Sequence, residues 1–278
     1  MRFFKCNLKL LAILLLFSII KTLRGNKMHD QTIEKNLNTF GISGNVLKIL
    51  GAIFMLIDHV GVILFPNVKV LRIIGRLAFP IFAFMIAEGC RYTKNKLRYF
   101  LTIFILGFMC QVVYYLYDKQ LKMSILITFS LSILAVYSLQ FVKDSLFNKK
   151  YGVFVKILSI IAFIAVIAGI YYLNQIFSID YGFWGCLTPL FASLLVKPNN
   201  VNFKVWDVID NKFTRLIIFG IGLIILAIEM GKNQIYSLLS LLILFLYSGK
   251  KGKANLKYFF YVFYPLHLVC LECLAMLM

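Results

Sequence analysis

Asp58 and His59 stand side by side within an apolar run that covers residues 46–65. A helix of roughly 20 apolar residues is long enough to cross the hydrocarbon core of a bilayer. A charged side chain at that depth costs about 2.5–3.5 kcal/mol on insertion scales, so such groups are usually paired or functional. Histidine is also the side chain best matched to proton transfer near neutral pH. The pair therefore indicates chemistry inside a membrane rather than packing alone.

The composition is typical of a polytopic membrane protein. Hydrophobic residues make up 61% of the 278 residues, and the mean hydropathy is +0.86, whereas soluble domains are about 45–50% apolar. Thirty Lys and Arg against 11 Asp and Glu give a net charge of +19. Because these basic residues form short clusters between apolar runs, we assign them to membrane topology and predict no nucleic-acid partner. Cys270 and Cys273 form a C-x-x-C without a second ligand pair, so no metal site is predicted.

Nine apolar runs predict an all-α bundle of about nine transmembrane helices. They cover residues 46–65, 71–90, 99–117, 123–142, 153–176, 183–196, 214–231, 235–248 and 257–277. We treat residues 46–278 as one transmembrane domain and residues 1–45 as a basic, hydrophobic extension. Residues 8–20 resemble a signal-peptide core, but no small-residue cleavage site follows them. We interpret them as a short extra helix; the alternatives are an interfacial helix and translated upstream sequence before Met28.

The basic clusters predict the orientation of the bundle in the cell membrane. They follow the second, fourth, sixth and eighth runs and comprise Arg91, Lys94, Lys96 and Arg98; Lys143, Lys149 and Lys150; Lys197, Lys204, Lys212 and Arg215; and Lys250, Lys251, Lys253 and Lys257. Alternate connections lie on one side of the membrane, which the positive-inside rule makes cytoplasmic. The connection at residues 174–182 carries no Lys or Arg, and we expect both it and the C-terminus outside.

Polar side chains of four distant segments are expected to meet in the outer half of this bundle. They are Asp58 and His59 of the first run, Arg72 and Arg76 of the second, Asp180 and Tyr181 at the start of the sixth, and His267 of the last. Arg72 and Arg76 are one helical turn apart and so share a face. We predict an interhelical ion pair between Asp58 and Arg76, because an unpaired buried charge is expensive.

Each of these residues also has a purely structural interpretation. The Asp58 ion pair could serve only to hold two helices together, and His59 could be a hydrogen-bonded core histidine. His267 is interpreted chiefly as a packing and hydrogen-bonding residue. Glu88, near the inner end of the second run, is expected to pair with Arg91 three residues later. Gln111 of the third run is expected to link helices through a hydrogen bond.

Four stretches of the sequence resemble the TraX family of integral membrane proteins. They are LKILGAIFMLIDHVG at residues 47–61, RIIGRLAFPIFAFMIAEGCRYTKN at 72–95, DYGFWGCL at 180–187 and YFFYVFYPLHLV at 258–269. This family is similar to the membrane acyltransferases, and its namesake acetylates the N-terminal amine of a conjugative pilin. One departure is Ser124, which stands where the family usually has Asn.

The resemblance implies acetyl transfer from cytoplasmic acetyl-CoA to an amine or hydroxyl at the outer side of the membrane. It implies that His59 is the general base or a transient acyl carrier, positioned by Asp58 and Arg76. Arg72 would stabilise an oxyanion or hold the acceptor. The remaining implied contacts are Glu88, Asp180, Tyr181 and His267 for substrate, and Arg91 and Lys94 for the CoA phosphates. The acceptor is left open among a peptide amine, a glycan hydroxyl and a lipid-linked sugar.

A proton-coupled transporter is the alternative from another functional class. In that interpretation Asp58, His59 and Glu88 form a proton relay through the bilayer. Many transporters are built from internal repeats, and the sequence shows no second Asp-His pair in its other half. Acetyl-CoA binding would distinguish the two interpretations.

Overall fold

The computed structural model describes residues 41–118, 122–199, 201, 203–252 and 256–277. Its elements, in chain order, are α2 (Gly44–Ile63), α3 (Lys69–Gly75), α4 (Ala78–Tyr92), α5 (Lys96–Asp118), β1 (Lys122–Met123), α6 (Ile125–Phe147), α7 (Val153–Ile176), β2 (Ser178–Ile179), α8 (Gly182–Ser193), α9 (Lys204–Ile209), α10 (Lys212–Met230), the 3₁₀ helix η1 (Lys232–Leu239), α11 (Ser240–Phe245) and α12 (Lys257–Ala275). The expected N-terminal helix at residues 8–20 lies outside the described residues.

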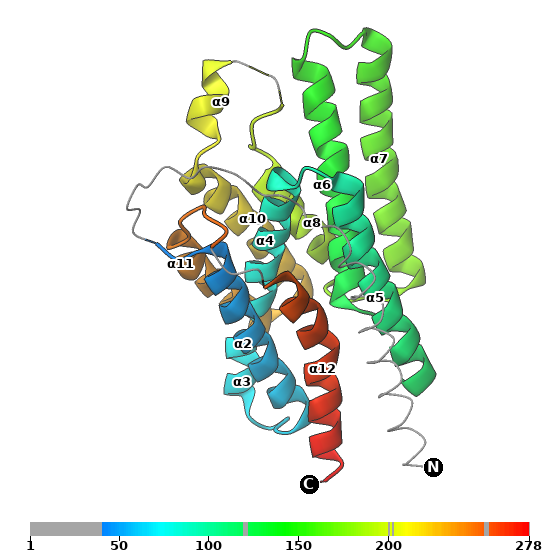
Figure 1. Ribbon diagram of the computed structural model, residues 1–278, viewed down its shortest axis with the longest axis vertical. Coiled ribbons are helices and arrows are strands. Elements are labelled where there is room, and N and C mark those ends of the chain that lie inside the picture. Colours follow the sequence, from blue (N-terminus) through cyan, green and yellow to red (C-terminus); the bar gives the residue numbers. More distant parts are fainter. Residues whose placement is uncertain (1–40, 119–121, 200, 202, 253–255, 278) are drawn as a thin grey trace.

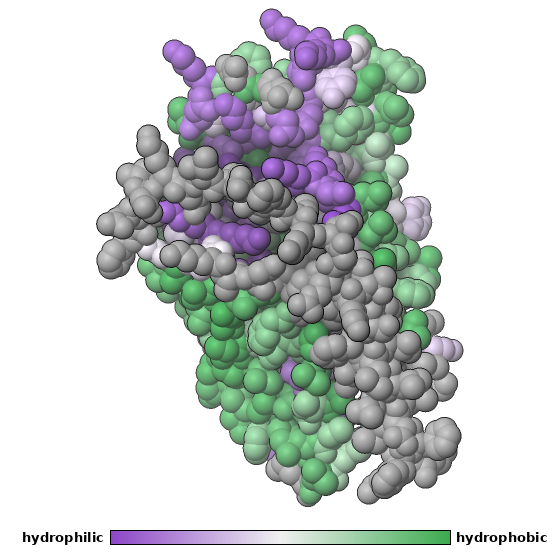
Figure 2. All heavy atoms as spheres, in the orientation of Figure 1, coloured by the Kyte–Doolittle hydropathy of each residue, from purple (hydrophilic) through white to green (hydrophobic). Residues whose placement is uncertain are grey.

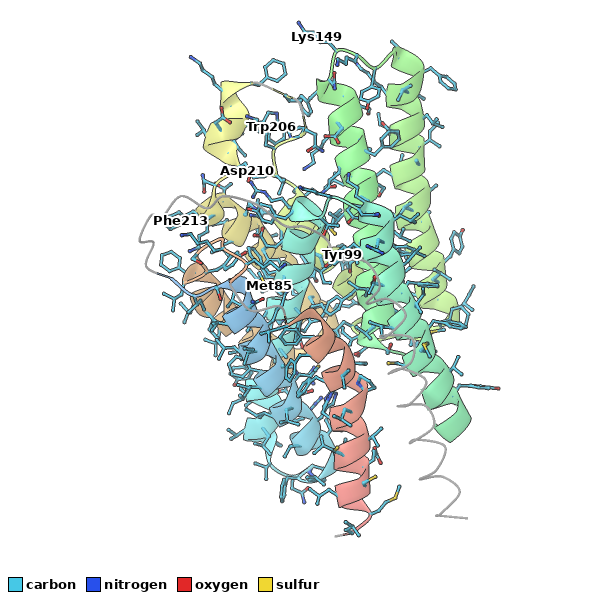
Figure 3. The ribbon with its side chains drawn as sticks, in the orientation of Figure 1. Met85, Tyr99, Lys149, Trp206, Asp210 and Phe213 are labelled. Atoms are coloured by element: carbon cyan, nitrogen blue, oxygen red, sulfur yellow. The ribbon has the colours of Figure 1, made fainter. Side chains whose placement is uncertain are left out.

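The helices form an elongated bundle whose two ends differ in character. The α6–α7 connection lies at one end and the C-terminus, after α12, at the other (Figure 1). Hydrophilic side chains gather at the α6–α7 end, and the face below is mostly hydrophobic (Figure 2). We call this the hydrophilic end; its exposed residues include Lys94, Lys96, Lys149, Lys150 and Lys204. Lys149, Trp206 and Asp210 mark it in Figure 3. The C-terminus lies at the end of the bundle opposite these residues (Figure 1); which end faces the cytoplasm stays a prediction.

The predicted helical membrane fold is confirmed, but the count of nine spans is not. Five helical segments are long and apolar enough to cross a membrane: α2, the α3–α4 segment, α6, α7 and α10. The only strands among the described residues are β1 and β2, which pair in parallel over two residues each. The structure is therefore a helical bundle with several membrane-spanning helices, as its composition predicts.

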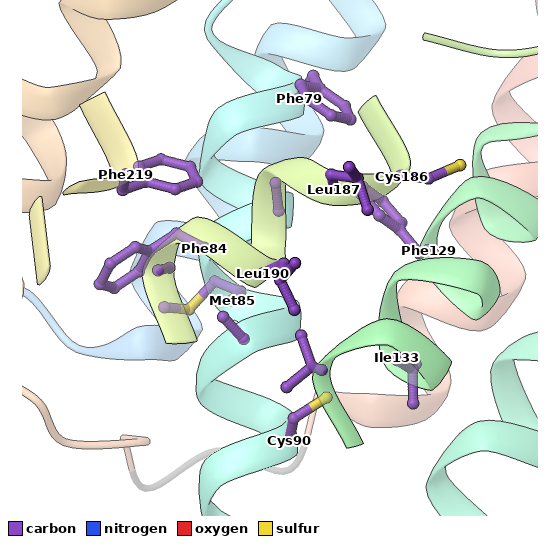
Figure 4. Packing of buried hydrophobic residues seen from close by; sticks show 14 of the residues in the cluster. Phe79, Phe84, Met85, Cys90, Phe129, Ile133, Cys186, Leu187, Leu190 and Phe219 are labelled. Atoms are coloured by element: carbon purple, nitrogen blue, oxygen red, sulfur yellow. The ribbon is translucent and has the colours of Figure 1, made fainter. Parts of the chain in front are cut away.

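The predicted sixth span is a buried core helix. Helix α8 has 12 residues, or about 18 Å at 1.5 Å per residue, and a bilayer core is about 30 Å thick. Its side chains pack against other helices on every side: Leu187 and Leu190 lie between α4 and α6 in Figure 4. Pro189 lies inside this helix and is itself buried. Hydropathy alone cannot distinguish such a core helix from a membrane-spanning helix, because the side chains of both are apolar and buried away from water.

The predicted eighth span is also too short to cross. The chain there forms the eight-residue 3₁₀ helix η1 and then the six-residue α11. Gly231, at φ 92°, ends α10 and begins this turn. Together they form a short apolar segment from Lys232 to Phe245 that packs against α10 and α4. This segment carries a polar residue, Gln234, into the bundle.

Candidate functional site

The central feature of the site is a hydrogen bond between two histidines from opposite ends of the chain. Nδ1 of His59 on α2 lies 2.8 Å from Nε2 of His267 on α12, and the ring centroids are 4.9 Å apart. His267 is 5% exposed, and its ring stacks on Phe263 at 4.9 Å. The sequence places these residues 208 positions apart, and only the packing of α12 on α2 brings them together. No third metal-ligating side chain joins them within the described ranges.

The hydrogen bonds of His267 determine which nitrogen of His59 is basic. Nδ1 of His267 is 2.8 Å from the carbonyl oxygen of Phe263, which can only accept, so this nitrogen carries the proton. In neutral His267 the other nitrogen, Nε2, is then an acceptor, and Nδ1 of His59 donates to it. Neutral His59 therefore has its lone pair on Nε2. No hydrogen bond to that atom is found within the part of the chain that the structure describes.

Asp58 pairs with Arg72 rather than with Arg76, so the predicted partner is wrong. Nη1 of Arg72 donates to Oδ2 of Asp58 at 2.6 Å, and the side chains are 30% and 16% exposed, respectively. Gly75 permits this approach, because a Cβ added there would lie 2.2 Å from Oδ1 of Asp58. Any side chain at residue 75 would displace the carboxylate. The pair thus fastens α2 to α3 next to His59.

Arg76 does not join that pair but bonds to η1. Nη1 of Arg76 donates to Oε1 of Gln234 on η1 at 3.3 Å. Helix α3 ends at Gly75, yet Arg76 keeps a helical backbone and its N–H donates to the Arg72 carbonyl. The two arginines are therefore one helical turn apart, as predicted, and differ in the partner that the neighbouring helix offers.

Several buried polar atoms of this region lack a partner among the described residues. They are Oδ1 of Asp58, Nε of Arg76 and Nε2 of Gln234. A buried polar group without a hydrogen bond costs about 1–3 kcal/mol, and such groups are uncommon enough to call for an explanation. We call Asp58, His59, Arg72, Arg76, Gln234 and His267 the histidine site.

Tyr181 connects the start of α8 to the histidine site. Its ring stacks on Phe79 of α4 at 4.0 Å, and its backbone is left-handed at φ 62°. Burial raises the pKa of Tyr181, and the charges of Asp58, Arg72 and Arg76 also act on the phenol. A buried phenol of this kind stays neutral and can donate. The ring stack places Tyr181 against Phe79 of α4, three residues beyond Arg76 in the sequence.

The carbonyl of Asp180 is held in place by α6. It accepts a hydrogen bond from Oγ1 of Thr128 at 2.7 Å, while its N–H donates to the Met123 carbonyl at 3.1 Å. Ser124, at the position where the family usually has Asn, begins α6 here, and its N–H donates to Gln111 at 3.3 Å. That bond between α5 and the start of α6 is the link expected of Gln111.

Glu88 lies outside the histidine site, and its predicted partner Arg91 is wrong. Glu88 on α4 forms a buried ion pair with Nη2 of Arg215 on α10. Nε of Arg215 also donates to the Ala192 carbonyl at 3.2 Å. Nearby, the buried Nζ of Lys143 donates to the carbonyls of Ser193 and Val196, each at 2.8 Å. We call Glu88, Lys143 and Arg215 the α4–α10 clamp.

Arg91 and Lys94, the two residues expected to bind the CoA phosphates, differ in whether their charge is already paired. Arg91 donates to Oδ2 of Asp210 at 2.8 Å, so its charge is already paired. Lys94 is exposed at the hydrophilic end.

Sequence reasoning missed Gln234, Lys143 and Arg215 as buried polar groups. Lys143 and Arg215 were assigned to basic loops, yet they are 7% and 6% exposed. Gln234 stands in a polar turn that looks solvated. A lone cation inside an otherwise apolar helix is the signal that could have identified Lys143 and Arg215, because it needs a buried partner.

The fold and the site together define a helical membrane protein with a paired-histidine site. The sequence model of the TraX protein family matches residues 43–275, so the chain belongs to the TraX family. Among curated proteins the chain is similar to the uncharacterized protein RP591 of Rickettsia prowazekii (strain Madrid E), at 38% identity over 94 residues. That similarity covers 34% of this chain and 36% of the relative, so only about a third of the relative's length is spanned. No solved structure matches the chain.

Proposed function

We propose that the protein is a membrane acetyltransferase that moves an acetyl group from cytoplasmic acetyl-CoA to an amine or hydroxyl at the outer side of the membrane. The observation that carries the proposal is the His59–His267 hydrogen bond, which leaves the lone pair of His59 on Nε2. A base oriented by a second hydrogen-bonding group is the arrangement that acyl transfer commonly uses. Family membership supports the same reaction class.

His59 would act through Nε2 in either of two balanced sequences. As a general base, Nε2 takes the proton of the acceptor N–H or O–H while the heteroatom attacks the acetyl carbonyl. The C–S bond then breaks, and the proton passes from Nε2 to the departing CoA sulfur. As an acyl carrier, Nε2 itself attacks the thioester carbonyl, the C–S bond breaks and CoA leaves as its thiolate. The acceptor then attacks the acetyl carbon, the bond to Nε2 breaks, and the freed Nε2 takes the acceptor's proton and passes it to the CoA thiolate. Both sequences require the same unprotonated nitrogen.

Arg76 is the group best placed to stabilise the negative oxygen of the tetrahedral intermediate. Its Nε is a buried donor without a partner among the described residues, and a fixed donor of this kind acts strongly where water is excluded. Arg72 is engaged by Asp58, so we assign this pair to positioning α3 beside His59. The assignment exchanges the roles that the family resemblance implies for the two arginines.

The acetyl donor would reach the site from the hydrophilic end. Exposed Lys94, Lys96, Lys149 and Lys150 would offer positive charge to the CoA phosphates. Arg91 would contribute less, because Asp210 already neutralises it. The pantetheine arm would extend from this end into the bundle toward His59.

Glu88, one of the three residues of the proton-relay interpretation, lies apart from Asp58 and His59. Glu88 lies 12 residues after Arg76, about 18 Å along the helix axis, and its charge is balanced by Arg215. The remaining pair, Asp58 and His59, does not extend across the bilayer. The geometry therefore favours the transferase.

Release of CoA thiol by the purified protein in phospholipid nanodiscs tests the proposal. We expect the wild-type protein to release CoA from acetyl-CoA and His59→Ala to lose about 10²–10⁴-fold of that rate, the usual contribution of a general base. His29→Ala is the matched control, since it removes a histidine of the N-terminal extension at residues 1–45, before the TraX match. A His59→Ala protein that is folded and turns over like the wild type would contradict both roles of His59.

A further inference from the structure

A cleft beside Tyr181 is lined by aromatic rings and two carboxylates. It has a volume of about 530 Å³, within the roughly 300–1,000 Å³ of small-molecule sites. It lies where the ends of α7 and α10 meet the start of α8. Its side chains include Tyr171, Gln175, Asp180, Tyr181, Trp184 and Glu229. Helix α7 runs from the hydrophilic end, and its other end lies at this cleft (Figure 1).

The aromatic rings of the cleft are held by one another at fixed angles. Phe183 packs edge-to-face on Tyr171, with 5.7 Å between centroids, and on Trp184, with 5.3 Å. Aromatic pairs in this geometry are stabilised beyond the area that they bury. Half-buried rings of this kind offer flat apolar faces to a ligand, and the C–H face of a pyranose ring is flat and weakly apolar.

The charged side chains of the cleft are both carboxylates. Asp180 and Glu229 contribute carboxylates, Gln175 contributes an amide, and the described lining contains no Lys or Arg. Helix α10 does not stabilise the charge of Glu229, because this carboxylate lies in the last turn, where the helix dipole disfavours negative charge. In a chain of net charge +19, this local reversal disfavours anions such as the CoA phosphates.

We infer that this cleft is the acceptor site and that it binds a neutral or amino-bearing sugar ring. The rings would pack on the pyranose face, and the carboxylates would accept hydrogen bonds from hydroxyl or ammonium groups. Tyr181 lines the cleft, and its ring stacks on Phe79, three residues after Arg76 on the same helical segment, so a bound sugar would lie one aromatic layer from the α4 end of the histidine site. The assignment of the cleft as the acceptor site rests on the proposed function. The inference that the cleft binds a sugar ring does not depend on that function.

Tryptophan fluorescence gives a direct test, because the chain has two tryptophans. Trp206 packs against Phe147 at the hydrophilic end (Figure 3), so Trp206→Phe leaves Trp184 as the only reporter. The protein is placed in nanodiscs of plain phospholipid, since alkyl-maltoside detergents would present a competing sugar. Methyl hexopyranosides, a hexosamine and a hexuronate are then titrated separately.

We expect a saturable change with the neutral sugar and the hexosamine, and at least tenfold weaker binding of the hexuronate. Glu229→Gln should weaken hexosamine binding and reduce the discrimination against hexuronate, whereas Glu272→Gln on α12 should change neither. No saturable change with any sugar, or equal binding of hexuronate, would overturn the inference.

The failure of this inference can be separated from failure of the proposed function. His59→Ala in the same background should bind sugar like its parent while it loses CoA release. Sugar binding without acetyl transfer would leave the cleft assigned and reject the transferase. Acetyl transfer without sugar binding would support the transferase and reject the assignment of the cleft.

Discussion

The histidine site and the α4–α10 clamp are both buried polar clusters, but they differ in how fully their atoms are bonded. In the clamp, the carboxylate of Glu88 meets Arg215, and Lys143 meets the carbonyls that end α8. No buried side-chain nitrogen or oxygen of these three residues lacks a partner. In the histidine site, three side-chain atoms are buried without a partner among the described residues, and Nε2 of His59 has no hydrogen bond there.

We therefore expect the clamp to stabilise the fold and the histidine site to bind a ligand. A fully bonded cluster has no remaining capacity to bind a ligand, and it ties α4, α6, α8 and α10 together. A cluster with unpartnered donors and acceptors loses stability, and such a loss is expected where a substrate supplies the missing bonds. The aromatic contact of Arg215 with Phe84, 5.4 Å to the ring centroid, adds to the clamp.

Breaking the clamp should have the largest effect on stability. Arg215→Met should lower the free energy of unfolding by about 3–5 kcal/mol, because it leaves Glu88 charged, buried and unpaired. CoA release per folded molecule should remain near that of the wild type. Denaturant or thermal unfolding in nanodiscs measures the first quantity.

The matched control for that variant is the double substitution Glu88→Leu with Arg215→Met. Apolar replacement of both partners of a buried ion pair is often neutral, so much of the lost stability should return. If Arg215→Met unfolds like the wild type but stops CoA release, the clamp is part of the active site and the comparison is wrong.

The helical membrane fold was predictable because hydropathy reports burial away from water. Four predicted spans are not among the five long apolar segments: α5, α8, η1 with α11, and α12. The same property explains two of them, because α8 is buried in protein and η1 with α11 is short, and hydropathy does not distinguish a lipid environment from a protein core. Asp58, His59, Arg72 and His267 were predicted to converge, and they do. The partner of Asp58 was not predictable, since Arg72 and Arg76 are one turn apart and Arg76 is engaged by Gln234 of η1, a distant segment.

Removing the second histidine should have the next largest effect, on rate rather than stability. His267→Phe keeps the ring stack with Phe263 but removes the acceptor for Nδ1–H of His59. We expect CoA release to fall on the order of 10²-fold, equivalent to about 2.7 kcal/mol at 1.36 kcal/mol per tenfold.

Partial rescue identifies a positioning role for His267. His267→Gln offers an amide oxygen to Nδ1 of His59 and should recover a measurable part of the rate. An equal loss in His267→Phe and His267→Gln would indicate that the ring of His267 acts directly, and unchanged turnover in both would remove it from the mechanism.

Neutralising Asp58 should have the smallest of the three effects. Asp58→Asn retains the shape of the side chain beside Gly75 but loses the charge opposite Arg72, which is partly exposed. We expect a stability loss of about 1 kcal/mol, as for a partly solvated pair, together with a lower rate of CoA release. A loss of stability as large as that of Arg215→Met would indicate that Asp58 mainly stabilises the fold, as the clamp does.

The ¹⁵N NMR spectrum of histidine-labelled protein in nanodiscs tests the central claim most directly. The claim is that neutral His59 carries its proton on Nδ1 and presents an unprotonated Nε2, with His267 as the acceptor. The signals of the three histidines are assigned by subtraction, using His29→Ala and His267→Phe. We predict that His59 shows a protonated Nδ1 and an unprotonated Nε2, and that His267→Phe changes this pattern. A His59 ring with its proton on Nε2 in the wild-type protein would contradict the account.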